Sequence, residues 1–444
     1  MKGAESLKTL RVLVCLCLLV PQATASELPE AVRLDLSSVL ERAGSSNIRM
    51  VLADEKIQQA FARIGSSASD LLPHAGFGTS QSRQTRNLEA MGIPTGFQNS
   101  LVGPFNSFDA RLTVQQSLFD WGAVERLRAA RAGKKLSQAE RVKTRQDVQS
   151  LAASLYFEAK RAAESVRFSE SLLASRKRLS EAVIAGAESG TSTALQARQA
   201  EDSVMLAEQA LQTARAKASE KRRDLLVVLS MDPSWDVLFP VREPSGLWEG
   251  FDFEVAGSKE NHPEIRRLEA ELEDIKAEKR AILADFLPRV TGLADYGPSG
   301  TSPSNWDTTY TLGAKLDWPI LEGGRKLFSL KQARSFLRQA EAEKANALLE
   351  VDARAMTAVD NLKQAAYLAE IREKQYRTAR QEWTLALQKF KNGVSTSAER
   401  YQAYSAYLQS ADERSQSEAL LQLAFIQTAH ALGRMSQWFD KEEL

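Results

Sequence analysis

The residue types that most often carry chemistry are few in this sequence and lie far apart. Its three histidines, His74, His262 and His430, are not spaced from one another, or from a carboxylate motif, as metal ligands are. His74 directly follows a Leu-Pro pair and His262 opens a helical pattern, so we expect loop or helix-capping roles for both. The sequence has no G-x-S-x-G, Walker A or dinucleotide-binding motif. We therefore predict no enzyme activity, no cofactor and no metal site.

Both cysteines lie in an N-terminal segment that is typical of a secretory signal. Basic residues precede the apolar run 12–20, which holds Cys15 and Cys17, and Ala23-Thr24-Ala25 then fits the small-x-small cleavage site. We predict a signal peptide at 1–25; an uncleaved anchor is disfavoured because the apolar run is too short to span a bilayer. Neither cysteine follows the small residue that lipoprotein processing requires, so no lipid anchor is expected. The rest of the sequence has no cysteine for a disulfide or thiolate site.

Charge and hydropathy narrow the class of protein further. The chain of 444 residues has 58 basic and 57 acidic residues, so its net charge gives no sign of a nucleic-acid partner. After the N-terminal segment no apolar run is long enough for a transmembrane helix. If this chain crosses a membrane, it must do so as a closed β-barrel.

One stretch, 325–392, dominates the helical pattern because it contains no Gly and no Pro and is rich in strong helix formers. Small apolar residues recur in it at spacings of three and four, as in a coiled-coil seam. A helix of this length would extend roughly 100 Å, so it needs partner helices of similar length. It should end at Lys391-Asn392-Gly393. The seam positions are Leu330, Ala333, Leu337, Ala340, Ala347, Val351, Ala355, Ala358, Leu362, Ala365 and Ala369.

The chain repeats one series of elements twice: helix, β-segment, long helix, turn and helix. The first copy has helical patterns at 31–72, from 122 to a turn at 186–190, and at 191–230; the second has them at 262–287, 325–392 and 395–433. We expect a first repeat at 26–231, a linker at 232–258, a second repeat at 259–434 and a tail at 435–444. The first copy carries a longer loop at 82–103. Trp235 and Trp248 should pack the linker onto the helices.

The β-segments alternate apolar and polar residues with a period of two. In a soluble protein the apolar side would be a sandwich core, but four short strands between long helices do not make a self-sufficient sandwich. They fit transmembrane strands of about 9–11 residues with the apolar side outward. We predict an interfacial girdle at Trp318 and Tyr310. The residues that we expect to face lipid are Leu112, Val114, Leu312, Leu316 and Trp318.

This layout resembles the TolC family of outer-membrane efflux and secretion channels over nearly all of residues 31–434. The resemblance is carried by the duplication, by the two Leu-Pro entries, by the corners at 119–122 and 321–324, and by the turns at 190–192 and 393–395. It implies a mainly α fold with a small β part: an elongated α-helical barrel and a trimeric twelve-stranded transmembrane β-barrel, four strands per chain. Four strands cannot close a barrel alone, which agrees with a homotrimer.

The resemblance also implies a function and partners. The protein would be the outer-membrane exit duct of a tripartite efflux pump or type I secretion system, a passive conduit whose helices lie in the periplasm. Its partners would be a periplasmic adaptor and, through it, an inner-membrane transporter. The alternative is a soluble periplasmic coiled-coil structural or adaptor protein. The expected adaptor-docking tip comprises Gly186, Gly190, Thr191, Ser192, Asn392, Gly393, Val394 and Ser395.

A periplasmic gate is the last feature that the resemblance implies. Glu399 stands where family members carry an acidic residue at the constriction, and Gln402 replaces a second acid found in some relatives. Gln196 is the corresponding position in the first copy, and Phe390 would add an apolar constriction. The alternative is that Glu399 is an ordinary solvated helix residue that pairs with Arg400 or Lys391 of a neighbouring chain.

Overall fold

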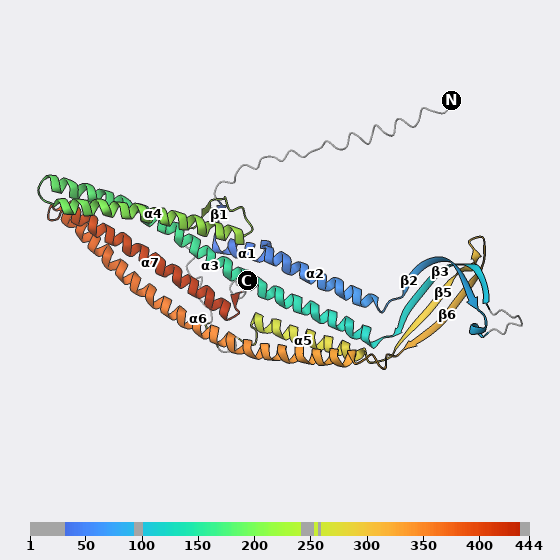
Figure 1. The fold of residues 1–444 in the computed structure, drawn as a ribbon. Coiled ribbons are helices and arrows are strands. Elements are labelled where there is room, and N and C mark those ends of the chain that lie inside the picture. Colours follow the sequence, from blue (N-terminus) through green and yellow to red (C-terminus); the bar gives the residue numbers. More distant parts are fainter. Residues whose placement is uncertain (1–31, 93–100, 241–252, 256–258, 436–444) are drawn as a thin grey trace, which may run out of the picture.

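The protein is a long rod of helices with a small sheet at one end, as seen in a computed structural model (Figure 1). The structure describes residues 32–92, 101–240, 253–255 and 259–435. The predicted signal peptide, Trp248 and nearly all of the predicted tail lie outside the described residues. Among the described helices, none is both long enough and apolar enough to cross a membrane.

Two helical hairpins form most of the rod: α3 (Trp121–Glu188) with α4 (Ala194–Val228), and α6 (Arg325–Lys391) with α7 (Ser397–Ala431). The prediction of one unbroken helix at 325–392 is confirmed. The two hairpins also pack against each other, because α3 contacts both α4 and α7. Six residues of the predicted seam are buried, which shows why small side chains were needed there: Ala333, Ala340, Val351, Ala355, Ala358 and Leu362.

The prediction of a single helix at 31–72 is wrong, because the chain forms α1 (Leu36–Ser46) and α2 (Ile48–Ser69). The break is Asn47, whose backbone is extended at φ −67° and ψ 138°. Its side-chain oxygen accepts a hydrogen bond of 2.8 Å from the Arg49 backbone, and its Nδ2 donates to the Val228 carbonyl at 2.6 Å. Asn47 therefore caps α2 and also joins it to the end of α4. Asn is one of the residues favoured at such N-cap positions.

His262 forms the equivalent joint in the second half. It is the N-cap of α5 (Pro263–Ala284), and its Nδ1 accepts a hydrogen bond of 3.2 Å from the Glu264 backbone. The ring also hydrogen-bonds the backbone of Ala431, the last residue of α7. The predicted capping role of His262 is thus confirmed. His74, in contrast, begins a strand.

The sheet is antiparallel in the order β2–β3–β5–β6: β2 (His74–Asn87), β3 (Leu101–Phe119), β5 (Arg289–Ser302) and β6 (Asn305–Asp317). The strands are longer than the sequence suggested. Much of the loop predicted at 82–103 belongs to β2, to a short 3-10 helix (Glu89–Met91) and to β3, while 93–100 lies outside the described residues. Among the described strands, β2 and β6 each have one partner, so both edges of the sheet are unpaired.

The main core lies at mid-rod, where buried residues of α1, α3, α4 and α7 form one cluster. Its largest fully buried side chains include Tyr156, Phe157 and Leu40. Beside it, β1 (Val32–Arg33) pairs in parallel with β4 (Val237–Leu238) of the linker region. Trp235 packs against this core, as predicted for the linker.

Candidate functional site

The sheet has one apolar face that continues across all four strands. Phe77, Leu112, Tyr296 and Tyr310 stand opposite one another in a single row, and Ala75, Val114, Ala294 and Leu312 form the next. Tyr310 is 79 % exposed and Leu312 82 % exposed, while Val114 is partly covered. An apolar surface of this size that faces outward marks a contact with lipid or with another chain.

Leu316 and Trp318 extend the same face toward the helices. A register shift between Ser117 and Phe119 brings Phe119 opposite Val290, which pairs with Leu316. Trp318 follows just after β6, and its indole N–H donates to the Phe286 carbonyl at 3.3 Å. Trp318 is therefore an exposed aromatic residue held at the end of the strand, as an interfacial girdle requires.

The opposite face of the sheet is polar and carries its own network. The Arg111 guanidinium donates to Asp109 at 2.6 Å, to Asp295 at 2.5 Å and to Thr309 at 3.0 Å. Thr113 and Thr311 both stand opposite Asp295. Apolar and polar side chains thus alternate along the strands. Such alternation is needed in a strand that has water on only one of its sides.

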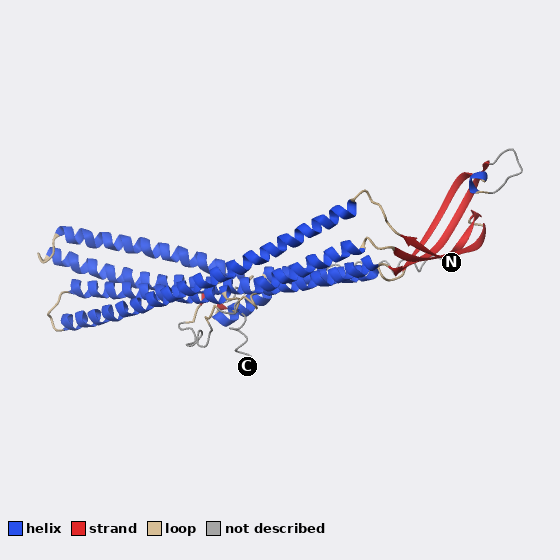
Figure 2. Cartoon of the chain, turned by 90° about the horizontal axis from the view of Figure 1, so that it is seen from below, coloured by secondary structure: helices blue, strands red, loops and turns tan. Residues whose placement is uncertain are grey.

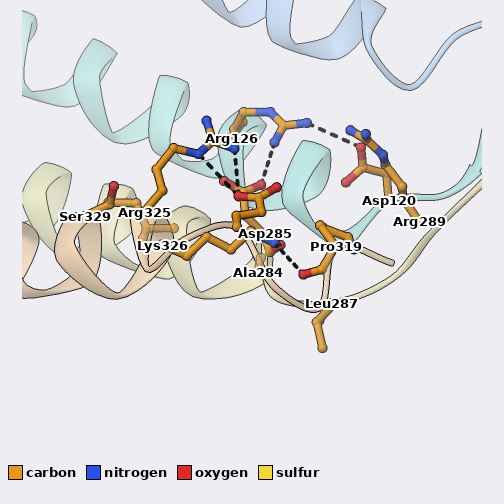
Figure 3. A pocket seen from close by; sticks show the side chains of 12 residues that line it. Asp120, Arg126, Ala284, Asp285, Leu287, Arg289, Pro319, Arg325, Lys326 and Ser329 are labelled. Carbon is orange, nitrogen blue, oxygen red and sulfur yellow. Dashed lines mark hydrogen bonds and ion pairs between the residues drawn. The ribbon is translucent and has the colours of Figure 1, made fainter. Parts of the chain in front are cut away.

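A cluster of ion pairs ties the sheet to the helices (Figure 3). Arg126 reaches Asp285 at 3.1 Å and Asp120 at 3.4 Å, and Lys326 donates to the Asp285 carbonyl at 2.5 Å. These residues line a cavity of about 320 Å³ between the ends of α3, α5 and α6. Gly122 lies beside it, where a Cβ would come within 2.7 Å of the Asp285 carboxylate and would displace that side chain.

At the far end of the rod the first hairpin turns through a tight loop (Figure 2). The backbone N–H groups of Thr191 and Ser192 donate to the Gly186 carbonyl at 2.8 and 3.0 Å. Gly190 has φ +78°, which favours glycine, and a Cβ on Gly186 would meet the Ser192 hydroxyl at 2.6 Å. Thr193 then caps α4.

The second hairpin turns in the same way. The Asn392 N–H donates to Gln388 at 3.0 Å, and Gly393 adopts φ +70° and donates to Phe390 at 3.1 Å. The Val394 N–H donates to the Lys389 carbonyl at 2.9 Å, which completes a glycine-terminated helix end. Ser395 is partly covered, whereas Val394 is 75 % exposed at the tip.

Glu399 has a local structural role at this turn. Its Oε2 accepts from the Thr396 backbone at 3.2 Å while the Thr396 hydroxyl accepts from the Glu399 backbone at 3.2 Å, so the two residues form a capping box. Gln196 makes the same box with Thr193. Glu399, Gln196 and Gln402 are all exposed. The type of residue at 196 and 399 is therefore explained by the helix start alone.

Phe390 belongs to an aromatic and arginine ladder along the α6–α7 seam, which the sequence analysis missed. Arg400 lies 4.2 Å from the Phe390 ring centre and 4.3 Å from that of Tyr401. Trp383 packs on Tyr404 with ring centres 4.8 Å apart. The signal was present in the spacing: three α6 aromatics recur every seven residues and three α7 tyrosines every three, namely Tyr376, Trp383 and Phe390, and Tyr401, Tyr404 and Tyr407.

Polar contacts join the two hairpins. Ser175 of α3 and Ser405 of α7 are hydrogen-bonded at 3.0 Å in a buried position. Arg161 pairs with Asp412 at 2.9 Å, and Ser415 donates to Glu164. Within the described ranges, no group of three His, Cys, Asp or Glu side chains is placed to hold a metal ion.

Comparison with known proteins gives a family and one related sequence. The family model described as outer membrane efflux protein matches residues 39–229 and 257–434, which is most of the chain. The pyoverdine export outer membrane protein OpmQ of Pseudomonas putida is 25 % identical over 316 residues. That match covers 70 % of this chain and 65 % of the relative, so the chain spans less than two thirds of the relative's length.

Solved structures share the fold. The outer membrane channel CmeC of Campylobacter jejuni superposes with a TM-score of 0.76 at 18 % identity, covering 92 % of this chain and 88 % of that one. The outer membrane protein VceC of Vibrio cholerae gives 0.72 at 17 % identity, covering 90 % of this chain and 96 % of that one. At these identities the likeness shows the arrangement of helices and strands.

Proposed function

Since this chain belongs to the outer membrane efflux protein family, as its TolC-like layout predicted, we propose that it is the exit duct of a tripartite efflux pump or type I secretion system. It is an outer-membrane transport protein and not an enzyme. The observation that carries the finer proposal is the sheet with one apolar and one polar face, joined at one end to helices long enough to line a tunnel. The division into repeats at 26–231 and 259–434 is part of the same proposal.

We infer that three copies assemble into one duct. Four strands with two unpaired edges favour a ring in which β6 of one copy pairs with β2 of the next, giving twelve strands. Exposed apolar side chains on the two outer helices support this ring, because α2 and α6 lie on opposite sides of the rod with α3 and α5 between them (Figure 1). They are Ile48, Leu52 and Phe61 on α2 and Phe328, Leu349 and Met356 on α6.

The hairpin tips are the proposed docking site for a periplasmic adaptor, which would link the duct to an inner-membrane transporter. They lie at the opposite end of the rod from the sheet (Figure 2), and Val394 offers an exposed apolar side chain there. The gate would lie at the same end, at Glu399, Gln402, Phe390 and Gln196. The capping box occupies Oε2 of Glu399, so the carboxylate can serve the turn and still present charge to the bore.

The related sequence favours a small molecule as the cargo of this duct. OpmQ is by its name a pyoverdine export outer membrane protein, and we propose a cargo of the same class for this chain.

Envelope fractionation followed by crosslinking tests the proposed assembly. We expect the protein in the detergent-extracted outer membrane, and a cysteine pair on the β6 and β2 edges should crosslink three copies into a closed ring. Recovery in the soluble periplasmic fraction would contradict the duct and favour the coiled-coil structural protein. Crosslinked dimers without trimers would contradict the ring.

A further inference from the structure

A second cavity lies between the start of α3 and the end of α5, close to the sheet, with a volume of about 270 Å³. Trp121 and Glu125 line it from one helix face of α3, one turn apart. Arg280 and Leu283 line it from one face of α5, and Leu287 lines it from the turn that follows α5. An exposed Trp, two leucines and an arginine thus meet at a buried carboxylate.

The strand register places this cavity on the apolar side of the sheet. Phe119 and Leu316 belong to the last apolar row, and Trp121 begins α3 two residues after Phe119. The cavity of ion pairs instead continues the polar face, because Arg289 stands opposite Asp317 and pairs with it at 3.0 Å. Figure 3 shows Leu287 pointing away from that charged cluster. The two cavities therefore flank the end of α5 on different sides.

The charges around the second cavity are fixed by Glu125, whose side chain is only 5 % exposed. One oxygen pairs with Arg128, and Oε2 lies 3.7 Å from Nε of Arg280 without a hydrogen bond. Arg128 also lies 5.1 Å above the Trp121 ring. The side chains of Arg128 and Arg280 are about half exposed, at 49 % and 52 %, so two cations flank one anion, with Arg280 at the open rim and Arg128 beside it. Such a rim favours an anionic ligand.

We propose that this cavity binds the headgroup of an anionic phospholipid at the surface of the outer membrane that faces the periplasm. Arg280 and Arg128 donate to the phosphate, and an acyl chain runs over Trp121 and Leu287 toward the apolar row of the sheet. Aromatic and basic residues are both enriched where a protein meets the membrane interface. The inference rests on the proposed insertion of the sheet into the outer membrane.

The test titrates purified protein in detergent with phosphatidylglycerol and counts retained lipids by native mass spectrometry. Arg280→Gln should weaken binding about fivefold, because it removes one cation from the rim and leaves the Glu125–Arg128 pair intact. Arg280→Lys keeps the charge and should recover most of the loss. The matched control is Arg325→Gln, which removes an exposed arginine from the other cavity and should leave lipid binding unchanged.

Other outcomes separate this inference from the proposed function. Outer-membrane recovery is scored first, so a wild-type protein that fails to reach the membrane contradicts the duct itself. Equal phosphatidylglycerol binding by wild type and Arg280→Gln overturns the lipid site while the duct stands. Inorganic phosphate at the same concentration should leave the protein's melting temperature unchanged. Stabilisation by phosphate equal to that by phosphatidylglycerol would overturn the lipid as ligand. A change in oligomer mass without a change in lipid count would assign the cavity to a neighbouring copy instead.

Discussion

The two helical hairpins share one backbone design and differ in the side chains along their seams. The long helices have 68 and 67 residues, the return helices have 35 each, and both turns use a positive-φ glycine followed by a capping box. When Gly393 is aligned with Gly190, the aromatic positions of α6 fall on small or aliphatic residues of α3. Tyr376, Trp383 and Phe390 correspond to Leu173, Ser180 and Ala187.

This difference shows which features the architecture needs and which one hairpin adds. Both hairpins form with small seam residues and helix caps, so aromatic rings are not required for the fold. Toward the tip of α3–α4, ion pairs such as Lys177–Glu208 at 2.8 Å are exposed, and exposed pairs contribute little to stability. Packed rings and cation–π contacts contribute more. We therefore expect the tip of α6–α7 to open less readily than that of α3–α4.

Removing the ladder should have the largest effect on the difference in stability between the two hairpin tips. The double variant Trp383→Ala with Tyr404→Ala deletes one packed pair of rings and should cost about 3 kcal/mol, given that both side chains are only partly buried. Hydrogen exchange at the α6–α7 tip should then rise to the level of the α3–α4 tip. Ser180→Ala is the control in the other hairpin and should change exchange little; unchanged protection in the double variant would show that the ladder does not hold the tip.

Substitutions at the turn glycines should instead affect the two hairpins equally. Gly190→Val and Gly393→Val each force a β-branched residue into positive φ, at φ +78° and +70°, and should cost about 1–2 kcal/mol. Adaptor docking should weaken in both variants, measured by co-purification from crosslinked cells, while outer-membrane recovery stays intact. A loss confined to one turn would break the equivalence of the two tips.

The two helix joints should differ in their response to pH, because Asn47 cannot titrate and His262 can. Burial, with a smaller effect of nearby His430, holds the pKa of His262 below its usual 6.5. Glu264 of α5 opposes this shift and Arg354 of α6 adds to it, while His430 itself pairs with Asp147 of α3. The unfolded chain therefore takes up the proton first, so the stabilisation is present above pH 6.5 and is lost as the pH falls toward the folded pKa.

Exchanging the two capping residues tests this difference. Between pH 7 and 5.5, hydrogen exchange at the start of α5, corrected for the intrinsic pH dependence of amide exchange, should show a few-fold increase in opening in the wild type and constant opening in His262→Asn. Asn47→His should transfer the pH dependence to the start of α2. An α5 response that persists in His262→Asn would assign the pH dependence to another group.

The smallest effect on stability is expected for Glu399→Gln. Gln196 forms the same capping box in the first hairpin, so the change should alter the unfolding free energy by only a few tenths of a kcal/mol. In a planar bilayer, however, cation selectivity should fall and block by multivalent cations from the periplasmic side should weaken if three carboxylates ring the bore. Unchanged selectivity and block would place the constriction elsewhere and leave Glu399 with its capping role.

How far the sequence could predict this molecule depended on whether a local pattern was complete. The long α6 was predictable because no Gly or Pro interrupts it, and its end was marked by Gly393. The break at Asn47 was not, because helical spacing continues on both sides of a single capping residue whose partner, Val228, is distant in sequence. Strand lengths were underestimated because β2 has few apolar residues to alternate. The ladder needed knowledge of which helix faces which.

The central claim, that the apolar face of the sheet lies in the outer membrane, is tested most directly by charge placed on each face. Leu312→Arg puts a cation on the apolar face and should cost about 2–4 kcal/mol per copy at the bilayer midplane. Thr311→Arg, one residue away on the polar face, is the matched control. We predict that outer-membrane trimer recovered from cells falls sharply for Leu312→Arg and is retained for Thr311→Arg. Equal recovery of the two variants would contradict the account.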